Sequence, residues 1–392
     1  MPTLRGWVLS GAGLALIILW WVFGDPELLL TGIFFVVAEL AAIGYVLRHD
    51  PQLDMGRRLG STTVHNGDTT TVTLVLLNRR RRPLRHLSIH DEVESLGMAV
   101  FEIAKLMGDE TASATYRVTC RPRGVYRVGP ARATTSDPLR LAELSAPDGP
   151  IDRLVVYPTV EELTGFPVIR GRDPAISASR PEHSQRGGED FYTLREYQRG
   201  DDMRRVHWPY TAKTDELMIR QLETPWQSRA LVLLDVRPSV YESADAFEMA
   251  VSGAASVVTH LVKSGFDADL WAGDPEPIDV SRYSAAMERL ALVEPNDEID
   301  IEAVAGRIRQ KGGGGALVLV TGVADRSLLT VQQLLSNQYR ATLLMGASST
   351  TSQTLVGFHR LGVATVTVDP TGEWASAWLS ATRSSWTAVS AS

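Results

Sequence analysis

Two long apolar runs at the start of the chain constrain its fold more than any other feature. The runs from Trp7 to Phe23 and from Leu28 to Leu47 together contain one acidic or basic side chain, Glu39. Each run is long enough to cross a membrane as a helix, the first near the short limit. A cleaved signal peptide is the alternative for the first run, but Trp20–Phe23 are too bulky for a cleavage site. We therefore expect a transmembrane helical hairpin in residues 1–50, with helices at about 7–23 and 28–47.

The charges that flank these runs predict the orientation of the hairpin. Arg5 precedes the first run and Arg48 follows the second, whereas the break at 24–27 carries only acids. The positive-inside rule then places both termini in the cytoplasm, on a protein of the cell membrane with two spans. The single cysteine, Cys120, agrees with a reducing compartment because it has no partner for an internal disulfide.

Glu39 stands near the middle of the second run, and the first run offers no cation to pair with it. An ionisable group inside a membrane is costly and is a functional hypothesis by default. Three interpretations stay open for this intramembrane polar residue. In the first, Glu39 is a neutral acid that faces the first helix or another subunit. In the second, it forms a contact for helix assembly or with a polytopic partner. In the third, it is part of a proton path.

Residues 51–160 predict a small β-sandwich-like domain. Short alternating runs such as 70–78, 115–120 and 124–129 are separated by turn signals at Gly, Pro and Asn residues. The first of these strands is followed by four consecutive arginines, Arg79–Arg82, with Arg85 close behind. Two interpretations remain for them: a solvated hairpin end, or a contact to anionic lipid heads, since the domain is tethered to the membrane.

Residues 226–392 alternate apolar strands with helical patterns, which predicts an α/β domain built on a parallel sheet. In such sheets, sites form at the carboxyl ends of the strands, and Asp235 and Thr321 both lie at such ends. Asp235 and Ser239 resemble an oxygen-ligand pattern for Mg²⁺, but the position between them that needs a hydroxyl is Arg237. We therefore treat Asp235 and Ser239 as a degenerate metal site, in which Arg237 pairs with Asp235 and replaces the ion.

The segment from 186 to 223 concentrates charges of both signs around aromatic residues. Phe191, Leu194 and Tyr197 are spaced for one helical face, and Gly200 suits the end of such a helix. An ion-paired structural hairpin and a docking surface are the competing interpretations, and in the second the interaction residues are Glu189, Arg195, Tyr197, Asp201, Arg205 and Trp208. We also expect Tyr197 and Trp208 to anchor the hairpin.

A family resemblance joins these parts. The strings Gly188-Glu-Asp-Phe, Leu194-Arg-Glu-Tyr, Gly200-Asp201 and Arg205-x-x-Trp208 resemble the signature of the "domain of unknown function 58" family. The resemblance implies two transmembrane helices, a β-sandwich-like domain at 51–160, the signature segment at 161–225 and a Rossmann-type von Willebrand factor A-like domain at 226–392. It further implies a MoxR-type AAA+ ATPase as partner, together with a transglutaminase-like membrane protein.

The net charge and the lack of known catalytic motifs disfavour several classes of function. The formal net charge of −7 disfavours a nucleic-acid binder. Nucleotide-binding, hydrolase and zinc-protease motifs do not occur in the sequence. We expect a membrane-anchored cytosolic adaptor or assembly factor that works with the ATPase, with no catalytic residues and no cofactor. A metal-dependent ligand-binding module with Mg²⁺ at Asp235, and an uncharacterised enzyme, are the alternatives.

Overall fold

The computed structural model describes residues 1–165, 193–196, 206, 208, 211, 217–221, 229–311, 314–339, 341–348 and 353–387. These residues form two compact units, Met1–Tyr157 and Pro158–Ser392. Each unit is described separately below.

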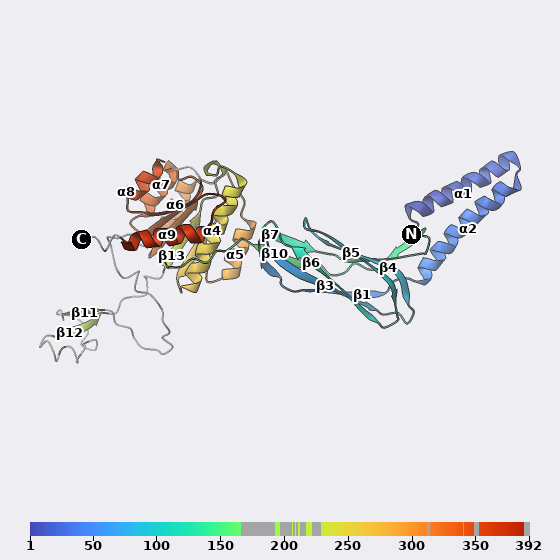
Figure 1. The fold of residues 1–392 in the computed structure, drawn as a ribbon, viewed down its shortest axis with the longest axis horizontal. Helices are drawn as coiled ribbons and strands as arrows, with labels where there is room; N and C mark the ends of the chain where they lie inside the picture. Colours follow the sequence, from blue (N-terminus) through green and yellow to red (C-terminus); the bar gives the residue numbers. More distant parts are fainter. Residues whose placement is uncertain are drawn as a thin grey trace. The chain divides into compact units, whose positions relative to one another are not determined.

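Two helices form the start of the first unit: α1 (Leu4–Phe23) and α2 (Pro26–Arg48). Both are long and apolar enough to cross a membrane. Thr3 and Asp25 cap their amino ends, and Pro26 occupies the first turn of α2, where no backbone donor is needed. The helices run side by side (Figure 1), and Gly13 and Gly32 permit close approach, since a Cβ on Gly32 would lie 2.8 Å from the carbonyl of Gly13.

The base of this hairpin is fixed to the β-strands that follow. Thr3 donates from its backbone nitrogen to the carbonyl of Leu141 (2.8 Å) and from its hydroxyl to that of Arg140 (2.8 Å). The backbone nitrogen of Glu143 donates to the carbonyl of Met1 at 2.8 Å. A small apolar cluster covers the same junction, formed by Ala42, Val46, Leu141 and Ala142. The hairpin therefore meets the β-domain through hydrogen bonds as well as apolar packing.

Two sheets make up this β-domain. The smaller has the antiparallel order β1 (Leu53–Leu59), β3 (Thr69–Asn78) and β6 (Thr111–Thr119). The larger has the order β2 (Thr63–His65), β10 (Asp152–Tyr157), β7 (Gly124–Val128), β4 (Leu84–Val93), β8 (Arg132–Ser136) and β9 (Glu143–Ser145), and β5 (Gly97–Leu106) also pairs with β4. Leu74 and Leu76 from the first sheet share one core with Leu87 and Ile89 from the second. The sheets thus pack on each other, as the predicted sandwich requires.

A buried ion cluster also joins the two sheets. Arg57 on β1 bonds Asp91 on β4 at 2.5 Å, and both side chains are fully buried. The same guanidinium donates to Asp152 (2.8 Å) and to the carbonyl of Val128 (2.9 Å), and the hydroxyl of Tyr116 donates to Asp91 at 2.7 Å. Burial opposes the charged form, but the hydrogen bonds and charges of the two carboxylates outweigh it and raise the pKa of Arg57.

The second unit contains a six-stranded sheet. Its order is β15 (Ile278–Asp279), β14 (Asp267–Trp271), β13 (Arg229–Leu234), β16 (Ala316–Thr321), β17 (Ala341–Ala347) and β18 (Ala364–Val368), and all neighbouring pairs except β14–β15 are parallel. The helices are α4 (Ala244–Lys263), α5 (Tyr283–Leu292), α6 (Ile301–Lys311), α7 (Arg326–Leu335), α8 (Thr354–Arg360) and α9 (Trp374–Thr387).

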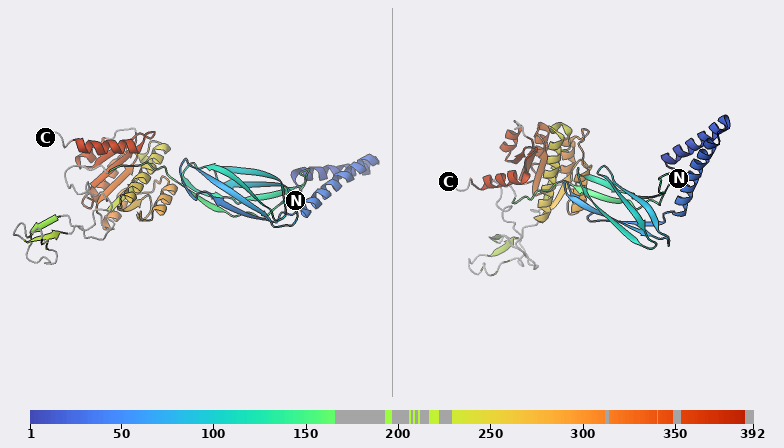
Figure 2. Two further views of the ribbon diagram at one scale, coloured as in Figure 1. Left: turned by 60° about the horizontal axis from the view of Figure 1, so that its bottom comes forward. Right: turned by 45° about the vertical axis from the view of Figure 1, so that its right-hand side comes forward.

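Every residue of β16 is buried, so both faces of the sheet are covered, and Figure 2 shows helices on both sides. This explains why the central strands are apolar throughout instead of alternating. The predicted alternation of strands and helices is confirmed. The longest helix of this alternation is α4, with 20 residues.

The buried cluster in the β-domain leads to a stability prediction. Replacing Arg57 with Met leaves the Asp91 carboxylate buried without its cation, which should cost about 3–5 kcal/mol of unfolding free energy. Restoring neutrality with Arg57→Met/Asp91→Leu should recover much of that loss. The matched control is Arg79→Gln, which breaks the exposed Arg79–Asp54 pair and should cost less than about 1 kcal/mol. Thermal and chemical denaturation of the full chain would test this, and equal losses for Arg57→Met and Arg79→Gln would contradict it.

Candidate functional site

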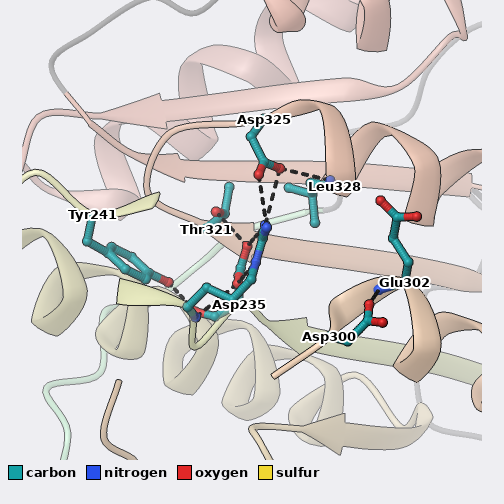
Figure 3. Close-up of polar contacts among 8 residues, drawn as sticks. Asp235, Tyr241, Asp300, Glu302, Thr321, Asp325 and Leu328 are labelled. Carbon is teal, nitrogen blue, oxygen red and sulfur yellow. Dashed lines mark hydrogen bonds and ion pairs between the residues drawn. The ribbon is translucent and has the colours of Figure 1, made fainter. Parts of the chain in front are cut away.

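The candidate site lies at the carboxyl end of the central strand β13. Asp235 follows this strand directly, is fully buried, and donates from its backbone nitrogen to the carbonyl of Val320 at 2.8 Å. This bond places it beside the end of β16, where Thr321 is also fully buried. Figure 3 shows Asp235, Thr321 and Asp325 facing one another. This is the edge where open α/β sheets bind ligands.

Arg237 fills the space between the two carboxylates. It donates to Asp235 from Nε (3.0 Å, to Oδ1) and Nη2 (2.7 Å, to Oδ2), and to Asp325 from Nη1 (2.9 Å, to Oδ2) and Nη2 (3.1 Å, to Oδ1). The planar guanidinium thus bonds both acids through two oxygens each, which is the geometry that favours arginine over lysine. Its side chain is only 13% exposed. Burial disfavours the charged form, but the hydrogen bonds and charges of Asp235 and Asp325 raise the pKa of Arg237 above its ordinary value.

Neighbouring groups hold these three side chains in place. The hydroxyl of Thr321 donates to Oδ2 of Asp235 (3.3 Å), and the hydroxyl of Tyr241 donates to the backbone carbonyl of Asp235. Burial, with the nearby charge of Asp235, raises the pKa of Tyr241. Asp325 also accepts from the backbone nitrogen of Leu328 at 2.8 Å and so caps α7. The guanidinium therefore ties the end of β13 to the start of α7.

The predicted metal ligands do not fit an ion in this arrangement. The oxygens of Asp235 are already bonded by Arg237 and Thr321, and Ser239 is exposed in the 3₁₀ turn Pro238–Val240. Within the part of the chain that the structure describes, no group of three or more His, Cys, Asp or Glu side chains is arranged to hold a metal. The predicted pairing of Arg237 with Asp235 is confirmed. The second acid, Asp325, was missed, although an Asp just before a helical pattern signals a cap.

The interaction residues of the signature segment are only partly placed. Glu189, Tyr197, Asp201 and Arg205 lie outside the described residues. Arg195 lies in β11 (Thr193–Glu196), which pairs antiparallel with β12 (Met218–Gln221), so the helix predicted across Leu194 is wrong there. The helix was predicted because Phe191, Leu194 and Tyr197 recur every three residues. Such a short pattern does not distinguish a helix from a short strand that pairs with a distant segment. Trp208 is 62% exposed, which leaves it accessible to a partner and gives its predicted anchoring of the hairpin no support from burial.

Glu39 lies near the middle of α2, as its sequence position indicates, and its carboxyl group faces α1, which agrees with the first of the three interpretations. The two helices run antiparallel, so the carboxyl-terminal half of α2 packs beside the start of α1. Glu39 therefore lies next to Gly6. A Cβ added to Gly6 would lie 2.3 Å from the carbonyl oxygen of Leu141 and 2.4 Å from Glu39 Oε1. Glu39 is 3% exposed, and neither of its carboxyl oxygens has a hydrogen-bond partner among the described residues. It therefore belongs to the junction with the β-domain.

Comparisons with known proteins bear on this site. The family model described as "Protein of unknown function DUF58" matches residues 193–279, a range that begins at β11 and includes Asp235 and Arg237. The predicted resemblance to this family is thus supported over residues 193–279. The uncharacterized protein YeaD of Bacillus subtilis (strain 168) is 31% identical over 244 residues, which are 60% of this chain and 59% of YeaD. The chain thus matches less than two thirds of that relative's length.

Solved structures resemble small parts of the chain. A CARDB domain from Pyrococcus furiosus in complex with di-metal ions matches at 16% identity and a TM-score of 0.23, over 28% of this chain and 94% of that domain. A domain of a putative cell surface protein from Methanosarcina acetivorans matches at 12% identity and a TM-score of 0.22, over 27% of this chain and 92% of that domain. At these TM-scores the likenesses carry no argument about function.

The geometry of Arg237 predicts how the site responds to Mg²⁺. The unmodified chain should show no saturable Mg²⁺ binding below about 1 mM in titration calorimetry, because the guanidinium occupies the position of the ion. Arg237→Ser removes this cation and supplies a hydroxyl oxygen, so binding should appear. Arg237→Ser/Asp235→Asn is the matched control and should lose it again. Sub-micromolar binding by the unmodified chain that disappears in Asp235→Ala would overturn this assignment.

Proposed function

We propose that this chain is a membrane-anchored adaptor without catalytic activity that presents its second unit to a MoxR-type AAA+ ATPase. The observation that carries the proposal is the bridge of Arg237 between Asp235 and Asp325. A fixed cation at the ligand-binding edge of an α/β sheet suits docking of a partner, because the edge keeps its charge and shape without bound metal. The DUF58 segment includes this edge.

The strand order supports a von Willebrand factor A-like domain in the second unit. Five parallel strands carry one short antiparallel strand, β15, at the edge, and the site lies after the central strand β13. In this interpretation Arg237 replaces the ion that related domains use to bind ligands. In the alternative of a metal-dependent module, Arg237 would have to move away from both carboxylates. This movement would break its four hydrogen bonds to Asp235 and Asp325.

An enzyme is the weaker alternative. Ser88 contacts His90 (3.1 Å), and Thr365 contacts His359 (2.7 Å), so hydroxyl–imidazole pairs do occur. A nucleophile of this kind also needs a group that orients the base. Among the described residues, no carboxylate bonds either imidazole. These contacts are therefore consistent with ordinary surface hydrogen bonds on β4 and around β18.

The proposed anchoring makes a prediction about topology. Reporter fusions placed after residue 50 and at the carboxyl terminus should both report the cytoplasm, because Arg5 and Arg48 flank a turn that holds only acids. A fusion within the turn at 24–27 should report the opposite side. An extracytoplasmic signal from the carboxyl-terminal fusion would contradict the proposed orientation.

The proposed docking makes a prediction about Trp208. This side chain is largely exposed, so Trp208→Ala should leave the melting temperature of the full chain nearly unchanged. Exposed tryptophans are frequent hot spots of interfaces, and the affinity for the purified ATPase should fall about tenfold or more. Val356→Ala, at a residue 54% exposed on α8, is the control and should bind normally. Equal affinities of both variants and the unmodified chain would remove Trp208 from the docking surface.

A further inference from the structure

The four consecutive arginines of the β-domain lie at the carboxyl end of the second membrane helix. They form the turn between β3 and β4. Nη1 of Arg80 donates to the carbonyl of Arg48, the last residue of α2, at 3.2 Å, and Arg80 also pairs with Asp50 at 3.8 Å. The position of this turn beside the hairpin is therefore fixed by direct contacts. We call Arg79–Arg82 together with Arg85 the arginine turn.

The backbone of the arginine turn is held rigidly. Asn78 is fully buried, and its Nδ2 donates to the carbonyls of Arg82 (2.9 Å) and Met107 (2.9 Å), while its Oδ1 accepts from the backbone nitrogen of Arg80 (3.0 Å). Gly108 packs against the same turn, since a Cβ on it would lie 2.6 Å from the carbonyl oxygen of Arg81. The guanidinium groups thus project from a preorganised support, which lowers the entropy cost of binding.

The arginine turn carries more positive charge than the acidic residues paired with it neutralise. Arg79 pairs with Asp54 and Arg80 with Asp50. Arg81, Arg82 and Arg85 are exposed, and none of them forms an ion pair within the described chain. Exposed acids occur nearby at 109 and 110, but the Glu110 carboxylate accepts the backbone nitrogen of Met107. Three exposed guanidinium groups without an ion pair therefore remain on or next to the turn whose Arg80 contacts the end of α2.

Exposed apolar tips lie on the loops around the same junction. Met107 is 49% exposed beside the arginine turn, and Leu139 is 68% exposed in the loop whose Arg140 carbonyl accepts from the cap of α1. Cations combined with apolar tips match the interface of a membrane, where headgroup phosphates lie above the acyl chains.

We propose that the arginine turn binds the headgroup phosphates of anionic lipids around the hairpin. Clusters of four to eight basic residues immediately cytoplasmic of a membrane helix attract anionic leaflets, and guanidinium groups bond phosphate oxygens in pairs. The inference rests on the proposed membrane anchoring and adds a lipid preference to it. The binding orients the β-domain on the membrane surface, because the turn and the hairpin are joined through Arg80 and Arg48.

The test uses the full chain with a fluorophore at Met107→Cys, where the buried Cys120 will not compete for the label. The protein in zwitterionic micelles is titrated with dihexanoyl phosphatidylglycerol, with the phosphatidylcholine analogue, or with inorganic phosphate. We expect a saturable response to the phosphatidylglycerol alone. Arg81→Gln/Arg82→Gln should weaken it roughly 25-fold, at about fivefold for each arginine, and Arg81→Lys/Arg82→Lys should retain most of it.

The matched control is Arg117→Gln/Arg127→Gln, which removes two exposed arginines elsewhere on the β-domain and should leave the response unchanged. An equal loss in both double variants, no response to phosphatidylglycerol, or saturation by inorganic phosphate at the same concentration would overturn the proposal. Flotation with phosphatidylcholine vesicles tests the anchoring separately. A chain that floats without any preference for phosphatidylglycerol refutes the arginine turn alone, whereas a chain that does not float refutes the anchoring.

Discussion

The second unit depends on one guanidinium placed between two carboxylates. Asp235 is fully buried at the end of the central strand, where an unpaired charge would cost several kcal/mol. Arg237 neutralises it and extends to Asp325, which in turn caps α7. The bridge therefore fixes the loops after β13 and β16, which form the edge where a ligand or partner would bind. The proposed role of this chain as a docking module rests on that bridge.

The first unit also contains a buried arginine between two carboxylates, but there the arginine joins two sheets. Arg57 pairs with Asp91 and Asp152 between two sheets, while Arg81 and Arg82 stand exposed on the turn that Arg80 joins to the end of α2. Buried arginines here hold elements together, and exposed ones are available to bind. The hairpin is tied to the same unit through Thr3 and the loop at Leu141, so the position of the helices is coupled to that of the β-domain.

Patterns local in sequence predicted much of this fold. The apolar runs around α1 and α2, the uniformly buried strand β16 and the long helix α4 each carry their own signal. Contacts between distant residues were not predictable in the same way. Asp325 lies 88 residues from Arg237, Asp91 lies 34 from Arg57, and the strand at Arg195 pairs with a segment after residue 217. The position of Glu39 depended on the register of the two helices, which periodicity does not reveal.

The most direct measurement is anomalous diffraction from crystals of the full chain soaked in Mn²⁺, an ion that takes the oxygen ligands of a magnesium site. The account predicts no anomalous peak beside Asp235, with the Arg237 guanidinium bonded to Asp235 and Asp325. A peak at coordination distance from Asp235 and Ser239, with Arg237 turned away from both acids, would contradict it and establish a metal-dependent module.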